Sequence, residues 1–159
     1  MVLNKFTYFT VIIILILSLS VACKKNEKDI EQEHLSSAID KIDVDNNANW
    51  IVILPGLGCH GCIQVAEAFM KDNIENKEIL FVLTKISSLK ILQQKIGVQV
   101  KEHPNVYIDR EDIFAIPTDN SHYPCIIRLK NKKIDMHMFQ SPDNKQAFSN
   151  LKAQITAKS

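Results

Sequence analysis

Continuous apolar runs alternate along the chain with segments whose apolar residues recur at helical spacing. The runs contain β-branched residues and are bounded by polar or turn-forming residues, which is typical of buried strands. The last two runs are separated by Asn131 and Lys132, which predicts a hairpin. The predicted strands cover residues 50–54, 79–83, 105–108, 124–129 and 133–139.

Helices are predicted between and around these strands. Helical spacing of apolar residues predicts one amphipathic helix at 28–42 and another directly after the first strand. A third helix is expected to begin at Ser87 or Ser88 and to end at Gly97, and the Ser-Pro-Asp run at 141–143 is a helix start. Helices alternating with strands, followed by a hairpin and a helix, predict an α/β sandwich with a mixed central sheet flanked by helices.

The N-terminus has the features of a signal peptide. Lys5 precedes an almost wholly apolar stretch at 6–17, which is shorter than the roughly 20 residues of a membrane-spanning helix and leads into small residues. The run Leu-Ser-Val-Ala-Cys at 19–23 resembles the lipobox of bacterial lipoproteins. The resemblance implies cleavage before Cys23 and a lipid on its thiol, which anchors the protein in the inner or outer membrane of a bacterial envelope with its domain on the extracytoplasmic side. An ordinary secretory signal and a short membrane anchor are the alternatives.

This interpretation divides the chain into three parts. Residues 1–22 are the lipoprotein signal peptide, residues 23–45 hold the lipidated Cys23, a tether and a short amphipathic helix, and residues 46–159 form one folded domain. The charge is nearly balanced, with 19 Lys and Arg against 18 Asp and Glu, and no basic stripe is present. Nucleic-acid binding therefore has no electrostatic basis in this sequence.

Two of the four cysteines stand close together in the motif Cys59-His60-Gly61-Cys62, at the predicted start of a helix. Thiols at this spacing can close a small reversible disulfide. A helix N-terminus also stabilises the thiolate, because its unpaired N–H groups and the helix dipole favour negative charge. A protonated His60 next to the first thiol would favour the thiolate further and make the pair more oxidising. Dithiol–disulfide chemistry is the leading hypothesis, with a metal site and an inert bridge as alternatives.

The strand before this motif, the motif itself and Tyr123-Pro124 before the hairpin strand together resemble the thioredoxin fold over residues 48–158. The long stretch between Cys62 and Pro124 is more similar to the membrane-tethered thiol–disulfide oxidoreductases, and to the peroxiredoxin-like branch, than to a minimal thioredoxin. The resemblance implies that Cys59 is the exposed nucleophile and Cys62 the buried resolving thiol. It also implies a cis Pro124 that lies against the pair, with the Tyr123 backbone presented to an extended peptide. The implied partners are protein thiols and disulfides and an unknown recycling partner, with no cofactor.

Cys125 is left over, and the competing functions differ in how they use it. Core filling is the expected role of a buried cysteine. The Gly-x-x-Cys-x-x-Cys spacing at 56–62 also resembles a copper- or zinc-binding metallochaperone, in which Cys59, Cys62 and Cys125 would be the thiolate ligands and His60 and His122 could add to them. The third possibility is a non-catalytic thioredoxin-like binding module in which the bridge is only structural.

Overall fold

The computed structural model describes residues 25–157, so the predicted signal peptide and the lipidation site at Cys23 lie outside the described residues. Within them, a five-stranded sheet has the order β3-β2-β1-β4-β5. β1, β2 and β3 run parallel, whereas β4 is antiparallel to both β1 and β5. The strands are β1 (Trp50–Pro55), β2 (Ile79–Thr84), β3 (Val106–Asp109), β4 (Cys125–Lys130) and β5 (Lys133–Phe139).

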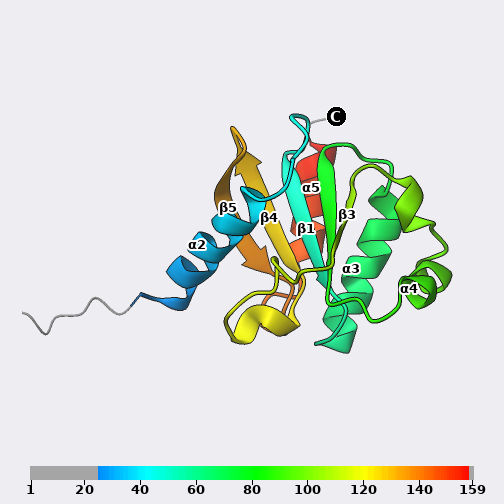
Figure 1. The fold of residues 1–159 in the computed structure, drawn as a ribbon, viewed down its shortest axis with the longest axis horizontal. Coiled ribbons are helices and arrows are strands. Elements are labelled where there is room, and N and C mark those ends of the chain that lie inside the picture. Colours follow the sequence, from blue (N-terminus) through cyan, green and yellow to red (C-terminus); the bar gives the residue numbers. More distant parts are fainter. Residues whose placement is uncertain (1–24, 158–159) are drawn as a thin grey trace, which may run out of the picture.

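Helices cover both faces of this sheet, as Figure 1 shows. The helices are α2 (Glu27–Ile39), α3 (His60–Asn73), α4 (Leu89–Ile96) and α5 (Ala147–Thr156), with short 3₁₀ turns η1 (Val100–Glu102) and η2 (Asp119–His122). Buried residues of α3, α4 and α5 form one apolar cluster with one face of the sheet. Buried residues of α2 form a second cluster with the other face. The predicted α/β sandwich with a mixed central sheet is confirmed, and the arrangement is compatible with a thioredoxin-like fold.

Strand β1 at the centre of the sheet shows how one apolar run supplies both clusters. Every residue of β1 is buried. Because successive side chains of a strand point to opposite faces, Val52 and Leu54 join the cluster under α3, whereas Ile51 and Ile53 join the cluster under α2. A strand covered on both faces has no polar alternation, and this is why the sequence shows a continuous apolar run.

Local signals determine the ends of α4. The Ser88 side chain accepts a hydrogen bond from the Ile91 N–H at 3.3 Å, which caps the helix, and Gly97 ends it in the left-handed conformation with φ of 71°. Both predicted ends are confirmed.

The predicted start of the last helix at 141–143 is wrong, because α5 begins at Ala147. The preceding residues form a turn whose side chains bind the backbone: Asn144 Nδ2 donates to the Phe139 carbonyl at 3.1 Å, and Gln140 Nε2 donates to the Lys145 carbonyl at 3.0 Å. Such local bonds compete with helix formation.

Helix α2 is built into the sandwich. Its residues Leu35, Ala38 and Ile39 are buried against the sheet, with Leu35 fully inaccessible. The helix expected within the 23–45 part therefore shares a core with the domain expected at 46–159. No helix among residues 25–157 is long and apolar enough to cross a membrane.

Candidate functional site

A short loop carries the chain from the end of β1 at Pro55 to the start of α3 at His60. Gly58 in this loop has φ of 147°, and a Cβ atom built there would lie 2.2 Å from the backbone oxygen of His122. Only glycine fits this position, because any side chain would collide with main chain in a conformation that L-residues rarely adopt. The loop is thereby pressed against η2, which is distant in the sequence.

The two cysteines of the motif are joined by a disulfide, with their Cα atoms 5.3 Å apart. Cys59 is the N-cap residue of α3 and is partly exposed, whereas Cys62 lies inside the first turn and is 8% exposed. No side chain caps this helix end. A reduced Cys59 would therefore have its sulfur beside the unpaired N–H groups of the first turn, which favours the thiolate.

The surroundings of the disulfide leave its outer side open. His60 and Gly61 are exposed, and a Cβ atom built on Gly61 would have no other atom within 4 Å. His60 is therefore free to meet a partner molecule. Its influence on the thiol remains a prediction.

The predicted cis geometry of Pro124 is wrong, because no peptide bond among residues 25–157 is cis. The chain leaves η2 through Tyr123, whose φ of −115° and ψ of 143° are extended, and enters β4 in the trans form. The Tyr123 N–H donates to the Asn120 carbonyl at 3.0 Å, and the Pro124 carbonyl accepts from the Gln140 N–H at 2.9 Å. Backbone hydrogen bonds therefore flank Pro124 on both sides, from η2 into β4.

The contact between this segment and the disulfide comes from His122 instead. Its backbone carbonyl accepts a hydrogen bond from the Cys59 N–H at 2.9 Å. The sequence does not predict this contact, because a backbone carbonyl can accept a hydrogen bond whatever side chain the residue has. The only signal was on the other partner: Gly58, immediately before the first cysteine, is the residue that permits the close approach.

Cys125 is not part of the site. It is fully buried at the start of β4, beside Ile53 of β1, in the cluster on the α2 face, whereas α3 lies on the opposite face. Burial raises the pKa of its thiol far above the usual range, and the Glu31 carboxylate raises it further. Cys59, Cys62 and Cys125 therefore do not form the alternative thiolate site, and no cluster of three or more His, Cys, Asp or Glu side chains suited to a metal occurs between residues 25 and 157.

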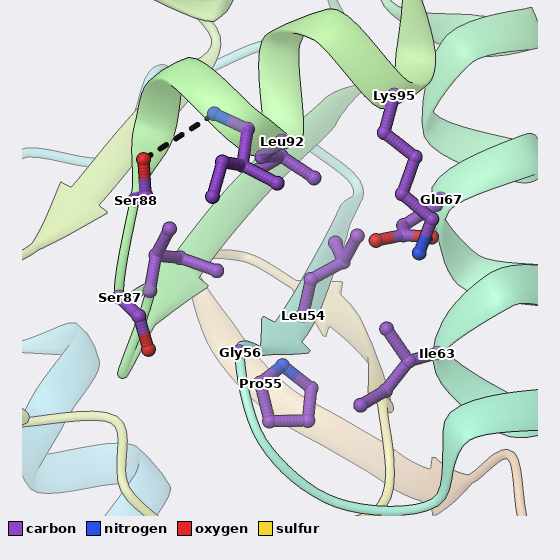
Figure 2. A pocket seen from close by; sticks show the side chains of 11 residues that line it. Leu54, Pro55, Gly56, Ile63, Glu67, Ser87, Ser88, Leu92 and Lys95 are labelled. Carbon is purple, nitrogen blue, oxygen red and sulfur yellow. Dashed lines mark hydrogen bonds and ion pairs between the residues drawn. The ribbon is translucent and has the colours of Figure 1, made fainter.

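A groove of about 210 Å³ runs between α3 and α4 beside the disulfide loop. Figure 2 shows Leu54, Ile63 and Leu92 pointing into it from the sheet and the two helices. Lys95 of α4 pairs with Glu67 of α3 at 2.5 Å across it. The lining includes both Gly56, which lies in the disulfide loop, and Ile63, which directly follows Cys62. Two large apolar side chains near this groove are strongly exposed, Leu57 at 66% and Ile91 at 67%.

The chain matches no protein-family model, no curated protein and no solved structure. The case for its function therefore rests on the geometry of the disulfide and its surroundings.

Proposed function

We propose that this protein is a thiol–disulfide oxidoreductase that exchanges disulfides with protein substrates through Cys59 and Cys62. The observation that carries the proposal is the position of the bridge at the N-terminus of α3, with Cys59 partly exposed and Cys62 buried. An inert bridge has no need of this asymmetry. An exchange reaction needs it, because one sulfur must be accessible to the substrate while the other stays shielded from solvent until it attacks the mixed disulfide.

The reaction has two steps. In the reducing direction the Cys59 thiolate attacks one sulfur of a substrate disulfide, a mixed disulfide forms, and the other substrate sulfur leaves as a thiolate. The Cys62 thiolate then attacks Cys59, which closes the bridge and releases the second substrate thiolate. Two electrons pass from the pair to the substrate, and the oxidising direction is the same sequence reversed.

The surroundings of the pair favour a polypeptide substrate. The groove between α3 and α4, which Ile91 helps to line, and the exposed side chain of Leu57 in the disulfide loop provide accessible apolar surface beside the pair. Burial of this apolar surface against a polypeptide would favour association. Cys23 would add an attachment to the envelope membrane, where disulfides persist.

A trapping experiment tests the proposal. In Cys62→Ser the mixed disulfide has no resolving thiol, so a peptide disulfide should become covalently attached at Cys59. Cys59→Ser should trap nothing and should lose insulin-reducing or refolding activity. Cys125→Ser is the matched control, because it removes a thiol remote from the site, and it should behave like the wild type. Equal activity in Cys59→Ser and the wild type rejects the proposal.

The redox potential of the pair separates catalysis from a structural bridge. Catalytic pairs lie between about −270 and −120 mV, whereas structural disulfides lie below about −300 mV. Equilibration with glutathione, followed by mass spectrometry of the Cys59–Cys62 peptide, gives the value. A potential below about −300 mV would assign the bridge to a non-catalytic binding module.

A further inference from the structure

Glu31 is a carboxylate buried in the interface between α2 and the rest of the molecule. Its side chain is 3% exposed. A buried charge is costly unless hydrogen bonds compensate it, and Glu31 has several. Its Oε1 accepts from Thr118 Oγ1 at 2.5 Å and from Asn120 Nδ2 at 2.7 Å, while its Oε2 faces His137 Nε2 at 3.0 Å. Burial alone would raise the pKa of Glu31, but these hydrogen bonds and the charge of His137 lower it below its usual value.

The partners of Glu31 hold together three segments that are far apart in the sequence. His137 belongs to β5, and its other ring nitrogen faces Gln32 Oε1 of α2 at 3.2 Å. Thr118 is the N-cap residue of η2 and Asn120 lies within η2. One carboxylate thus ties α2 both to the sheet and to η2.

The same turn η2 reaches the disulfide. It ends at His122, whose carbonyl accepts the Cys59 N–H at 2.9 Å and whose backbone lies against Gly58. A continuous series of contacts therefore connects the Glu31 carboxylate, through Asn120 and the backbone of η2, to the N-cap residue of α3. Pro124 is not one of the residues in this series of contacts.

From this series we infer that Glu31 is a positioning residue for Cys59, which it holds at the N-terminus of α3 through η2. The inference rests on the proposed function, because it concerns the reactivity of the same thiol. Helix α2, which carries Glu31, would then affect the redox site although it lies on the opposite side of the sheet from α3.

The expected consequence follows from how a helix end stabilises a thiolate. The effect falls off within the first turn, so it requires that Cys59 remain at its cap position. If η2 loses its anchor, Cys59 is less firmly held and its thiolate is less stabilised. Alkylation at neutral pH should slow, and the dithiol form should lose stability relative to the disulfide.

The test compares variants in the full-length protein. Glu31→Ala removes every contact of the carboxylate, and Asn120→Ala removes one donor from the η2 side. Glu31→Gln keeps an oxygen for Thr118 and Asn120 and should retain most of the wild-type behaviour. Leu35→Ala is the matched control, because it weakens the packing of the same helix and leaves the hydrogen bonds of Glu31 in place. The readouts are the pH dependence of Cys59 alkylation and the equilibrium constant with glutathione.

Glu31→Ala and Asn120→Ala should each slow Cys59 alkylation at pH 7 by about threefold or more and shift the glutathione equilibrium by a similar factor towards the disulfide. The double variant should show no more than the larger single effect, since both act on one contact series. Changes no greater than those of Leu35→Ala overturn the inference, even if stability falls. A wild-type protein that does not exchange with glutathione rejects the proposed function itself, which is a separate outcome.

Discussion

At the scale of single residues, the cysteines show how environment decides reactivity. Cys59 is partly exposed at a helix end, whereas Cys125 is fully buried. Burial raises the pKa of the Cys125 thiol, and the negative charge of Glu31 raises it further. Because the thiolate is the reactive form, the two thiols should differ widely in rate. After reduction, iodoacetamide should label Cys59 within minutes and leave Cys125 unmodified until denaturant is added. Rapid labelling of Cys125 in the native protein would contradict its assignment as a core residue.

The lowered pKa of Glu31 predicts that the stability of the protein depends on pH. Its pKa in the folded protein lies below the ordinary value of 4.5, so the unfolded chain takes up a proton at higher pH than the folded protein does. The stabilisation is therefore complete above about pH 4.5 and is lost as the pH falls through the lower folded value. Urea unfolding of the wild type and of Glu31→Gln between pH 7 and pH 3 should show a stability difference that shrinks in this acidic window. If the stability difference stays constant between pH 7 and pH 3, the ionisation of Glu31 is not its cause.

At the scale of elements, two glycines with positive φ offer a matched comparison. Gly97 ends α4 at φ of 71° with open space around it, whereas Gly58 has φ of 147° and His122 main chain 2.2 Å from a Cβ position. Gly97→Ala should cost about 1 kcal/mol, from backbone conformation alone. Gly58→Ala should cost more, because it also forces the loop away from η2, and it should alter the glutathione equilibrium of the disulfide. Thermal unfolding and the redox equilibrium measure the two effects, and equal behaviour of the two variants would count against the contact with His122.

At the scale of the whole molecule, the sheet separates two layers with different tasks. The layer of α3, α4 and α5 carries the disulfide and the groove, while α2, the first described helix, packs on the other face. If Cys23 bears a lipid, α2 is the first helix that follows the anchor in the sequence. Mass spectrometry of the mature protein should then find an acylated Cys23 as the first residue. An unmodified Cys23, or cleavage elsewhere, rejects the lipid anchor.

Features that depend on a few neighbouring residues are predicted correctly from the sequence, whereas features that depend on side-chain contacts are not. The strands, the caps of α4 and the position of the Cys59–Cys62 motif at a helix start follow from signals within a few residues, and these predictions are confirmed. The last helix begins later than Pro142 predicts, because the side chains of Gln140 and Asn144 bind nearby backbone and hold a turn there. The cis form of Pro124 is an expectation from the resemblance alone; the bond is trans, and backbone hydrogen bonds of Tyr123 and Gln140 flank it.

The sequence by itself determined the elements, the α/β class and the two thiols at a helix start, because periodicity, caps and spacing are local properties. Only the tertiary structure decided which groups surround those thiols. It placed the His122 carbonyl on Cys59, buried Cys125 on the far side of the sheet, and brought Glu31 to η2. Contacts between residues some 60 to 90 positions apart depend on how strands pair and layers stack, and single-residue patterns do not carry that information.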